Sequence, residues 1–245
     1  MSRAPLIRDP RVVPVVARDD HLPAVASERL LPAALRLRFA APPSWEPELP
    51  GDGGRWSDRT PTPASVLVPL VARPDGLTVL LTRRTDHLHD HAGQISFPGG
   101  RAEPQELGDP VATALRETEE EVGLARRHIE VIGRLPVYTT ITAYDVTPVV
   151  ALVEPGFELA LDPFEVAEAF EVPLDFLMTP AHHQRHEIDV PDGVRRHFLS
   201  MPWPPAARQA TAAGGASAIA APSDEYFIWG ATAAMLRNLY RFLSA

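Results

Sequence analysis

Short apolar runs along the middle of the chain are typical of β-strands. Residues 65–72 and residues 77–82 are rich in valine, leucine and threonine. The segment Arg73-Pro-Asp-Gly76 between them carries proline and glycine where a tight turn needs them, so the pattern predicts a β-hairpin. Further strands are predicted at Ile129–Leu135 and Val146–Val153.

The C-terminal half repeats this alternation of runs and turns. A second hairpin is predicted to pair Glu187–Val190 with Val194–Leu199 around Pro191-Asp-Gly193, and a last strand is predicted at Tyr226–Trp229. A closing helix is predicted from Ala231 to Leu243, with an inward face made of Leu236, Leu239, Tyr240 and Leu243.

Capping residues delimit the best-defined helix. Asp109 is a suitable N-cap, Pro110 occupies the first helical position, and residues 111–122 run without a breaker to Gly123, a natural C-cap. By the same reasoning, a second capped helix is predicted to start at Asp162-Pro163 and to run to about Phe170.

A short amphipathic helix is predicted near the N-terminus, from Ser27 to Ala40. Its apolar side would consist of Leu30, Leu31, Ala34, Leu35 and Leu37.

Strands and helices alternate without a strict rhythm and without a repeat, which predicts a mixed α/β layer structure. The proline-rich and glycine-rich stretch at 41–64 divides the chain into an N-terminal extension, residues 1–62, and a main domain, residues 63–245. The stretch from Pro202 to Pro222 is dominated by alanine, glycine and proline and is expected to be a mobile loop.

Composition excludes several classes of function. With 32 acidic and 23 basic side chains, the net charge of −9 argues against non-specific binding to nucleic acid or to an anionic membrane. The chain has no cysteine, which excludes thiol catalysis and Cys-ligated metal sites. Neither a signal peptide nor a long apolar span is visible, so we expect a cytoplasmic protein. The oligomeric state stays open, a homodimer included.

The helix that ends at Gly123 carries a group of carboxylates. At 100° per residue, Glu117, Glu120 and Glu121 fall within about a 100° arc, whereas Glu119 points elsewhere. Like charges at this spacing repel each other, so a cation is expected to compensate them. A divalent ion such as Mg²⁺ accepts carboxylate oxygens and fills its other positions with water and substrate phosphate. A solvated acidic face is the alternative.

The segment upstream favours the metal site. Ser96-Phe-Pro-Gly-Gly100 places two glycines after a strand, where the backbone can turn sharply and approach a ligand. Together with Arg116-Glu117-x-x-Glu120-Glu121-x-Gly123, this resembles the Nudix box: Gly, five residues, Glu, seven residues, then Arg-Glu-aliphatic-x-Glu-Glu-x-Gly-aliphatic.

The match to the box has two departures. Five residues separate Gly100 from Glu106, as the pattern requires, but nine residues rather than seven separate Glu106 from Arg116. The additional residues are expected in the loop before Asp109, which leaves the role of Glu106 open. Thr118 stands at a position that is usually aliphatic.

A second motif resembles the signature of the coenzyme A (CoA) pyrophosphatase branch of the Nudix hydrolases. Residues 80–100, from Leu-Leu-Thr-Arg-Arg-Thr to Ser-Phe-Pro-Gly-Gly, match every defined position of that signature except one, where His89 replaces Arg or Lys. The segment Tyr226–Met235 also resembles the entry into that branch's C-terminal helix.

The resemblance implies a Nudix α/β/α sandwich with a mixed β-sheet, which hydrolyses the diphosphate bond of CoA and its derivatives with Mg²⁺ or Mn²⁺. The implied metal ligands are Glu117, Glu120 and Glu121, and Arg116 would orient Glu117. Glu165 is a candidate general base, although the base could instead lie on the box helix. The candidate substrate-binding residues are Arg83, Arg84, His89, Gly99, Gly100 and Arg101.

Two other functions stay open: a Nudix hydrolase of ADP-ribose, NADH or a nucleoside triphosphate, and a Nudix-fold binding module without catalysis. Histidines at 87, 89 and 91 and in His182-His-Gln-Arg-His186 raise the question of zinc. We expect loop packing and substrate contact for the first group and a solvated loop or helix end for the second.

Overall fold

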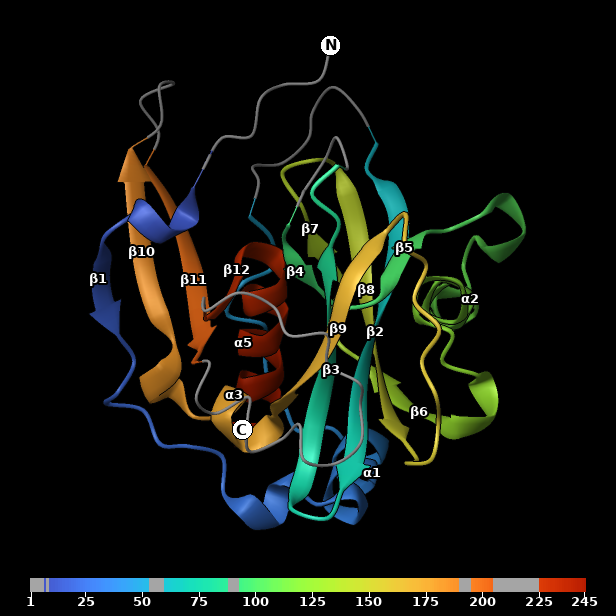
Figure 1. Ribbon diagram of the computed structural model, residues 1–245. Coiled ribbons are helices and arrows are strands. Elements are labelled where there is room, and N and C mark those ends of the chain that lie inside the picture. Colours follow the sequence, from blue (N-terminus) through green and yellow to red (C-terminus); the bar gives the residue numbers. More distant parts are fainter. Residues whose placement is uncertain (1–6, 8, 53–59, 88–92, 190–194, 205–224) are drawn as a thin grey trace.

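The computed structural model describes residues 7, 9–52, 60–87, 93–189, 195–204 and 225–245. A large mixed β-sheet forms its centre, and helices and a smaller sheet cover the two faces (Figure 1). In the large sheet the strands follow the order β4-β3-β2-β8-β6, and β5, β7 and β9 pair with β2, β8 and β3, respectively. These strands are β2 (Thr62–Arg73), β3 (Gly76–Arg84), β4 (Ile95–Ser96), β5 (Gly99–Arg101), β6 (Ile129–Arg134), β7 (Tyr138–Thr139), β8 (Tyr144–Val153) and β9 (Val166–Pro173).

The smaller sheet is antiparallel, with the order β1-β10-β11-β12. Its strands are β1 (Val15–Arg18), β10 (Gln184–Asp189), β11 (Arg195–Trp203) and β12 (Tyr226–Trp229). The helices of the chain are α1 (Pro32–Ala40), α2 (Pro110–Val122), the short α3 (Leu174–Leu177) and α5 (Gly230–Ser244). Short 3₁₀ turns include Ser27–Leu30 and Pro104–Glu106.

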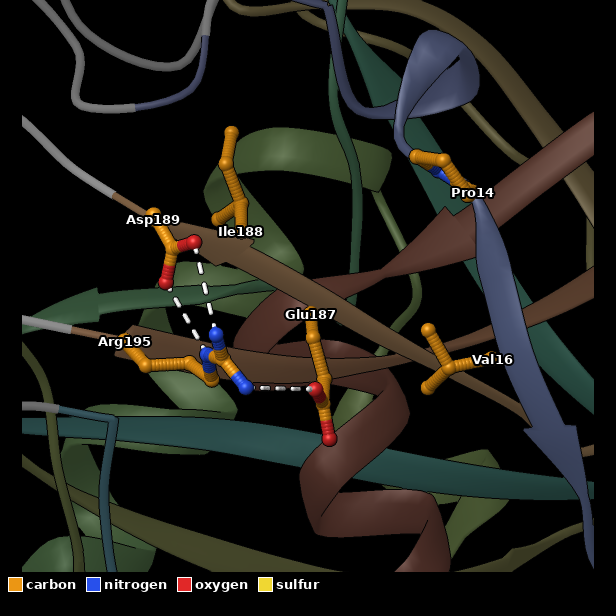
Figure 2. Close-up of a pocket in the computed structure, with 6 residues that line it drawn as sticks. All are labelled: Pro14, Val16, Glu187, Ile188, Asp189 and Arg195. Atoms are coloured by element: carbon orange, nitrogen blue, oxygen red, sulfur yellow. Dashed lines mark hydrogen bonds and ion pairs between the residues drawn. The ribbon is translucent and has the colours of Figure 1, made fainter.

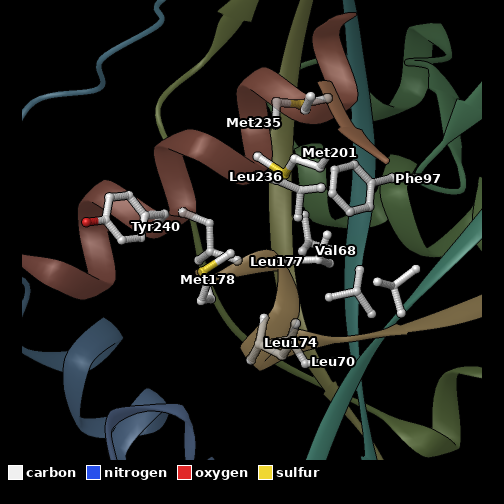
Figure 3. Close-up of a cluster of buried hydrophobic side chains, with 14 of the residues drawn as sticks. Val68, Leu70, Phe97, Leu174, Leu177, Met178, Met201, Met235, Leu236 and Tyr240 are labelled. Carbon is white, nitrogen blue, oxygen red and sulfur yellow. The ribbon is translucent and has the colours of Figure 1, made fainter. Parts of the chain in front are cut away.

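The predicted α/β sandwich with a mixed sheet is confirmed. Strands β2 and β8 run parallel, whereas the other pairs in the large sheet are antiparallel. Helix α2 packs on one face, where Ala114 joins Leu67, Val149 and Ala151 in an apolar cluster. Helix α5 and the smaller sheet cover the other face (Figures 1 and 3).

Most predicted elements are present. The first hairpin is β2 and β3, with Arg73 paired to Gly76, and the second is β10 and β11, although its turn at 190–194 lies outside the described residues. Helix α2 has the predicted bounds: Asp109 Oδ1 accepts the N–H of Ala112 at 3.1 Å, and Gly123 ends the helix at φ 69°. Helix α5 buries the predicted inward face, and most of the expected loop at 202–222 is not described.

The predicted helix from Asp162 to Phe170 is wrong. Residues 163–165 form a turn, and Val166–Pro173 is strand β9, which pairs with β3 over its whole length. Asp162 does cap a backbone N–H, that of Phe164 at 2.8 Å, but it closes a local turn rather than a helix. The pairing with β3 outweighs the local helix signal.

The N-terminal helix is also shorter than predicted. Pro32 divides the segment into a 3₁₀ turn and α1, because a proline cannot continue a helix that started earlier. Of the predicted apolar side, Leu30 and Leu35 are buried, whereas Leu31 and Leu37 are 57% and 73% exposed.

Candidate active site

Two glycines allow the chain to turn closely past helix α2. Gly99 has φ 151°, and a Cβ atom there would lie 2.4 Å from the carbonyl oxygen of Ser65. A Cβ atom on Gly100 would lie 2.5 Å from Oε2 of Glu117. The segment Ser96–Gly100, the glycine turn, therefore needs glycine at both positions to pass between strand β2 and the carboxylate of Glu117.

Glu121 lies at the centre of the site. The residue is 5% exposed, its Oε2 accepts the N–H of Gly99 at 3.0 Å, and its Oε1 lies 3.9 Å from Nη1 of Arg84. Burial raises the pKa of Glu121 to about 8, and the charges of Glu165 and Glu117 add to this effect against the opposing Gly99 and Arg84. Without a cation, this carboxylate is held in an environment that disfavours its charge.

Arg116 connects the other acidic side chains of the box. Its Nη2 lies 2.9 Å from Oε1 of Glu117, and its Nη1 donates to Glu120 Oε2 at 2.7 Å. Its Nε and Nη2 donate to the two oxygens of Glu106 at 2.8 and 3.0 Å, and Nη2 also donates to the carbonyl of Arg101. This fork of contacts fixes the guanidinium beside Glu117.

The structure shows what Glu106 does. Hydrogen bonds from Arg116 hold the pKa of Glu106 at about 2, with further contributions from the Glu103 N–H and the Thr113 hydroxyl. Gly108, in the loop between Glu106 and Asp109, has φ 89°. The nine-residue gap therefore leaves Glu106 within reach of Arg116.

Thr118, the other departure from the pattern, is fully buried on the inner side of α2. Its hydroxyl donates to the carbonyl of Ala114 at 2.6 Å, so its polar atom is satisfied within the helix. A threonine can therefore replace an aliphatic residue at this position.

Glu165 stands in the turn before β9, where its carbonyl accepts the N–H of Thr85 at 3.0 Å. Its charge raises the pKa of both Glu117 and Glu121. The turn thus brings a carboxylate from outside the box into electrostatic contact with Glu117 and Glu121, from a segment more than forty residues away in sequence.

The two adjacent arginines of strand β3 serve different faces of the sheet. Successive strand residues point to opposite faces, and Leu80, on the same face as Arg84, packs with Val122 of α2. Arg84 is the arginine that lies near Glu121, and its Nε is buried with no hydrogen-bond partner in the described part of the chain. Arg83 instead lies 3.4 Å from Oε2 of Glu168, its register partner on β9. The predicted pair of substrate-binding arginines is therefore not brought together.

The remaining predicted residues differ in how far the structure describes them. Arg101 is exposed, and His89 lies outside the described residues. His183 and His186 are buried, not solvated: His183 contacts the Leu177 carbonyl and Arg237, and His186 contacts the Val13 carbonyl and Ser200. Burial lowers the pKa of His183 to about 4.

A shallow pocket of about 200 Å³ lies elsewhere, on the smaller sheet (Figure 2). It is lined by residues of the β1 and β10–β11 region, where Arg195 pairs with Asp189 and Glu187: Pro14, Val16, Glu187, Ile188, Asp189 and Arg195. None of these residues belongs to the group of box glutamates.

The donor chemistry of the site fits a hard divalent cation. As the side chains are placed, no three histidine, aspartate or glutamate groups among the described residues are close enough to hold a metal, and Glu120 is engaged by Arg116. However, burial raises the pKa of both Glu117 and Glu121, and their acidic neighbours add to the effect. A cation bound to these carboxylate oxygens would offset both the cost of burying their charge and the repulsion from the neighbouring acids.

Comparisons with known proteins agree with the box. A model of the NUDIX domain matches residues 60–190. The chain is 35% identical over 181 residues to proteins named uncharacterized Nudix hydrolase NudL from Yersinia pestis (strain Pestoides F) and Yersinia pseudotuberculosis serotype O:1b (strain IP 31758). Each of these alignments covers 74% of this chain and 79% of the relative.

Solved structures of low sequence identity are similar over part of the chain. A C. elegans Ap4A hydrolase binary complex is 20% identical, with a TM-score of 0.40, and the match covers 48% of this chain and 85% of that one.

Within the part of the chain that the structure describes, no helix is both long enough and apolar enough to cross a membrane. From the domain model and the relatives, the chain belongs to the Nudix family of hydrolases, which act on nucleoside diphosphate derivatives and generally use divalent metal ions.

Proposed function

We propose that this Nudix hydrolase cleaves the diphosphate bond of CoA and CoA derivatives, releasing 3′,5′-ADP and 4′-phosphopantetheine or its acylated form. The observation that carries the proposal is the meeting of two motifs at one carboxylate. The signature at 80–100 contributes the Gly99 N–H and the Arg84 guanidinium, and both face Glu121 of the box.

Glu117, Glu120 and Glu121 would hold Mg²⁺ or Mn²⁺. When bound, the ion supplies neutralisation of the diphosphate charge and acidification of a bound water. Arg116 would keep the Glu117 carboxylate oriented through its 2.9 Å contact, and Glu106 would keep Arg116 in place.

We further propose that Glu165 accepts the proton of the attacking water. The turn before β9 places its charge close enough to Glu117 and Glu121 to raise the pKa of both, so the base would stand beside the ligands without being one of them. A positioned base together with electrostatic stabilisation is sufficient for phosphoryl chemistry, which needs no covalent nucleophile.

Arg84 would bind the diphosphate of the substrate. Its guanidinium is close to the metal ligands, and its buried Nε has no hydrogen-bond partner in the described part of the chain, so an anionic oxygen would satisfy an unmet donor. Gly99, Gly100 and Arg101 would line the same approach, and His89 remains a proposed contact.

The adjacent arginines provide a matched pair for testing this proposal. Arg84→Gln should raise the KM for CoA at least about tenfold, because a hydrogen bond to a charged group contributes about 1.5–3 kcal/mol. Arg83→Gln should leave the KM unchanged, since Arg83 is paired with Glu168 on the other face. Steady-state kinetics of both variants measure the difference, and equal KM values for the two would contradict the assignment.

Substrate specificity is tested by a panel of CoA, acetyl-CoA, ADP-ribose, NADH and a nucleoside triphosphate under identical metal conditions. The proposal expects the highest kcat/KM with CoA or acetyl-CoA. A higher value for ADP-ribose, NADH or the triphosphate would assign the enzyme to another Nudix specificity, and no turnover of any of them would favour a binding module.

A further inference from the structure

Helix α5 supports the glycine turn from the side opposite to helix α2. The hydroxyl of Thr232, in the first turn of α5, donates to the carbonyl of Ile95 at 2.9 Å, and both residues are buried. Ile95 is the first residue of β4 and lies directly before the glycine turn. Strand β4 is only two residues long: on one side it pairs with β3, where the Thr82 hydroxyl also bonds to Ser96, and the Thr232 hydroxyl adds a bond from α5.

Three consecutive residues of the glycine turn, Phe97, Pro98 and Gly99, are each fixed by burial or by a hydrogen bond. Phe97 is 2% exposed and lies in the core near Met235 and Leu236 of α5 (Figure 3). The carbonyl of Pro98 accepts the N–H of Leu67 at 2.9 Å, and the N–H of Gly99 donates to Glu121. The turn therefore lies between helix α2, with which it makes a polar contact, and the apolar core cluster to which α5 contributes.

Helix α5 is itself firmly anchored. Arg237 is 1% exposed and forms ion pairs with Asp19 at 3.1 Å and with Glu48 at 2.7 Å. The side chain of Asn238 makes two hydrogen bonds with the backbone of Leu49, at 2.7 and 3.0 Å. The N-terminal extension thus fixes the helix along the turns that follow Thr232.

We propose that Thr232 is a positioning residue for the metal site, acting through the Ile95 carbonyl on the Gly99 N–H that orients Glu121. This inference rests on the proposed role of Glu121 as a metal ligand. It gives the Tyr226–Met235 segment a function in hydrolysis although, among the described contacts, none of its side chains touches a glutamate of the box. Tyr226 instead donates to Glu168 of β9.

The test removes the hydroxyl without changing the shape of the side chain. Thr232→Val should weaken Mn²⁺ binding, titrated without substrate, by about fivefold, the equivalent of one net hydrogen bond of about 1 kcal/mol. The Gly99 amide hydrogen should also exchange faster with solvent, by a similar factor. Thr232→Ser retains a donor at this position and should restore both values.

Tyr240→Phe is the matched control. It also removes one buried hydroxyl of α5, but that hydroxyl donates to the carbonyl of Pro23 at 2.9 Å, away from β4. Tyr240→Phe should lower the melting temperature about as much as Thr232→Val, yet leave Mn²⁺ affinity and Gly99 exchange unchanged.

Equal Mn²⁺ affinities in wild type and Thr232→Val, or equal losses in Thr232→Val and Tyr240→Phe, would overturn the proposal, as would a Thr232→Ser variant that behaves like the valine variant. Failure of the underlying metal assignment has a different signature: Glu121→Gln would then bind Mn²⁺ as tightly as the wild type. Because Mn²⁺ is titrated alone, the result is independent of whether CoA is the substrate.

Discussion

Glu121→Gln is expected to lower kcat by more than about 100-fold at saturating Mg²⁺, because residues that merely support a metal ligand already contribute 10–100-fold. The substitution keeps the size of the side chain and an amide oxygen that can still accept the Gly99 N–H. It removes only the charge that would bind the cation. Activity and Mn²⁺ affinity, measured on the same preparation, should fall together.

The same variant should be at least as stable as the metal-free wild type at high pH. Burial raises the folded-state pKa of Glu121 from 4.5 to about 8, so the folded state binds an additional proton between these values. The contribution of Glu121 to the free energy of unfolding therefore decreases as the pH rises from about 4.5 to 8 and is constant above that range. Glu121→Gln should lack this decrease.

Thermal unfolding at pH 5 and pH 8.5, with and without Mn²⁺, measures both effects. Mn²⁺ should raise the melting temperature of the wild type at pH 8.5 and affect the variant much less, because a ligand stabilises only the state that binds it. Undiminished activity and an equal shift by Mn²⁺ in the two proteins would contradict the role given to Glu121.

Glu165→Gln is expected to lower kcat by about 10²–10⁴-fold, the usual contribution of a positioned general base. Mn²⁺ affinity should not fall, because the proposed role of Glu165 is to accept a proton, and its charge only adds to the repulsion around Glu117 and Glu121.

Glu158→Gln provides the control for charge, since Glu158 is an exposed acid in the same segment between β8 and β9. Its kcat should match that of the wild type. If Glu165→Gln retains the wild-type rate, the base lies elsewhere, with the box helix as the other location.

Local signals in the sequence predict much of the structure around the Nudix box. Asp109, Pro110 and Gly123 define both ends of α2, since capping depends on residues within one turn of the helix. The turn at 73–76 likewise predicts the hairpin of β2 and β3. Once the helix is defined, its periodicity places Glu117, Glu120 and Glu121 within one arc of its surface.

The sequence is less informative where distant partners decide the structure. Asp162-Pro163 resembles a helix start, but the residues that follow find backbone partners on β3 and form a strand. Arg83 and Arg84 look equivalent in the sequence, and only the sheet shows that they face opposite sides. Arg237 can be buried because it forms ion pairs with Asp19 and Glu48. Both acids lie about 190 residues or more before it in the sequence.

The role of Glu106 shows a similar limit. The sequence reveals a gap two residues longer than the family pattern, which leaves the role of Glu106 open. In the folded chain Glu106 makes a two-pronged contact with Arg116. A count along the sequence therefore underestimates how well such a site tolerates an insertion in a loop.

The most direct test of the account is to incubate the purified protein with CoA and Mg²⁺ or Mn²⁺ and to identify the products by mass. We expect 3′,5′-ADP and 4′-phosphopantetheine in equal amounts, with no product when the metal is chelated. Intact CoA under conditions in which ADP-ribose, NADH or a nucleoside triphosphate is hydrolysed, or a product cleaved at any bond other than the diphosphate, would contradict it.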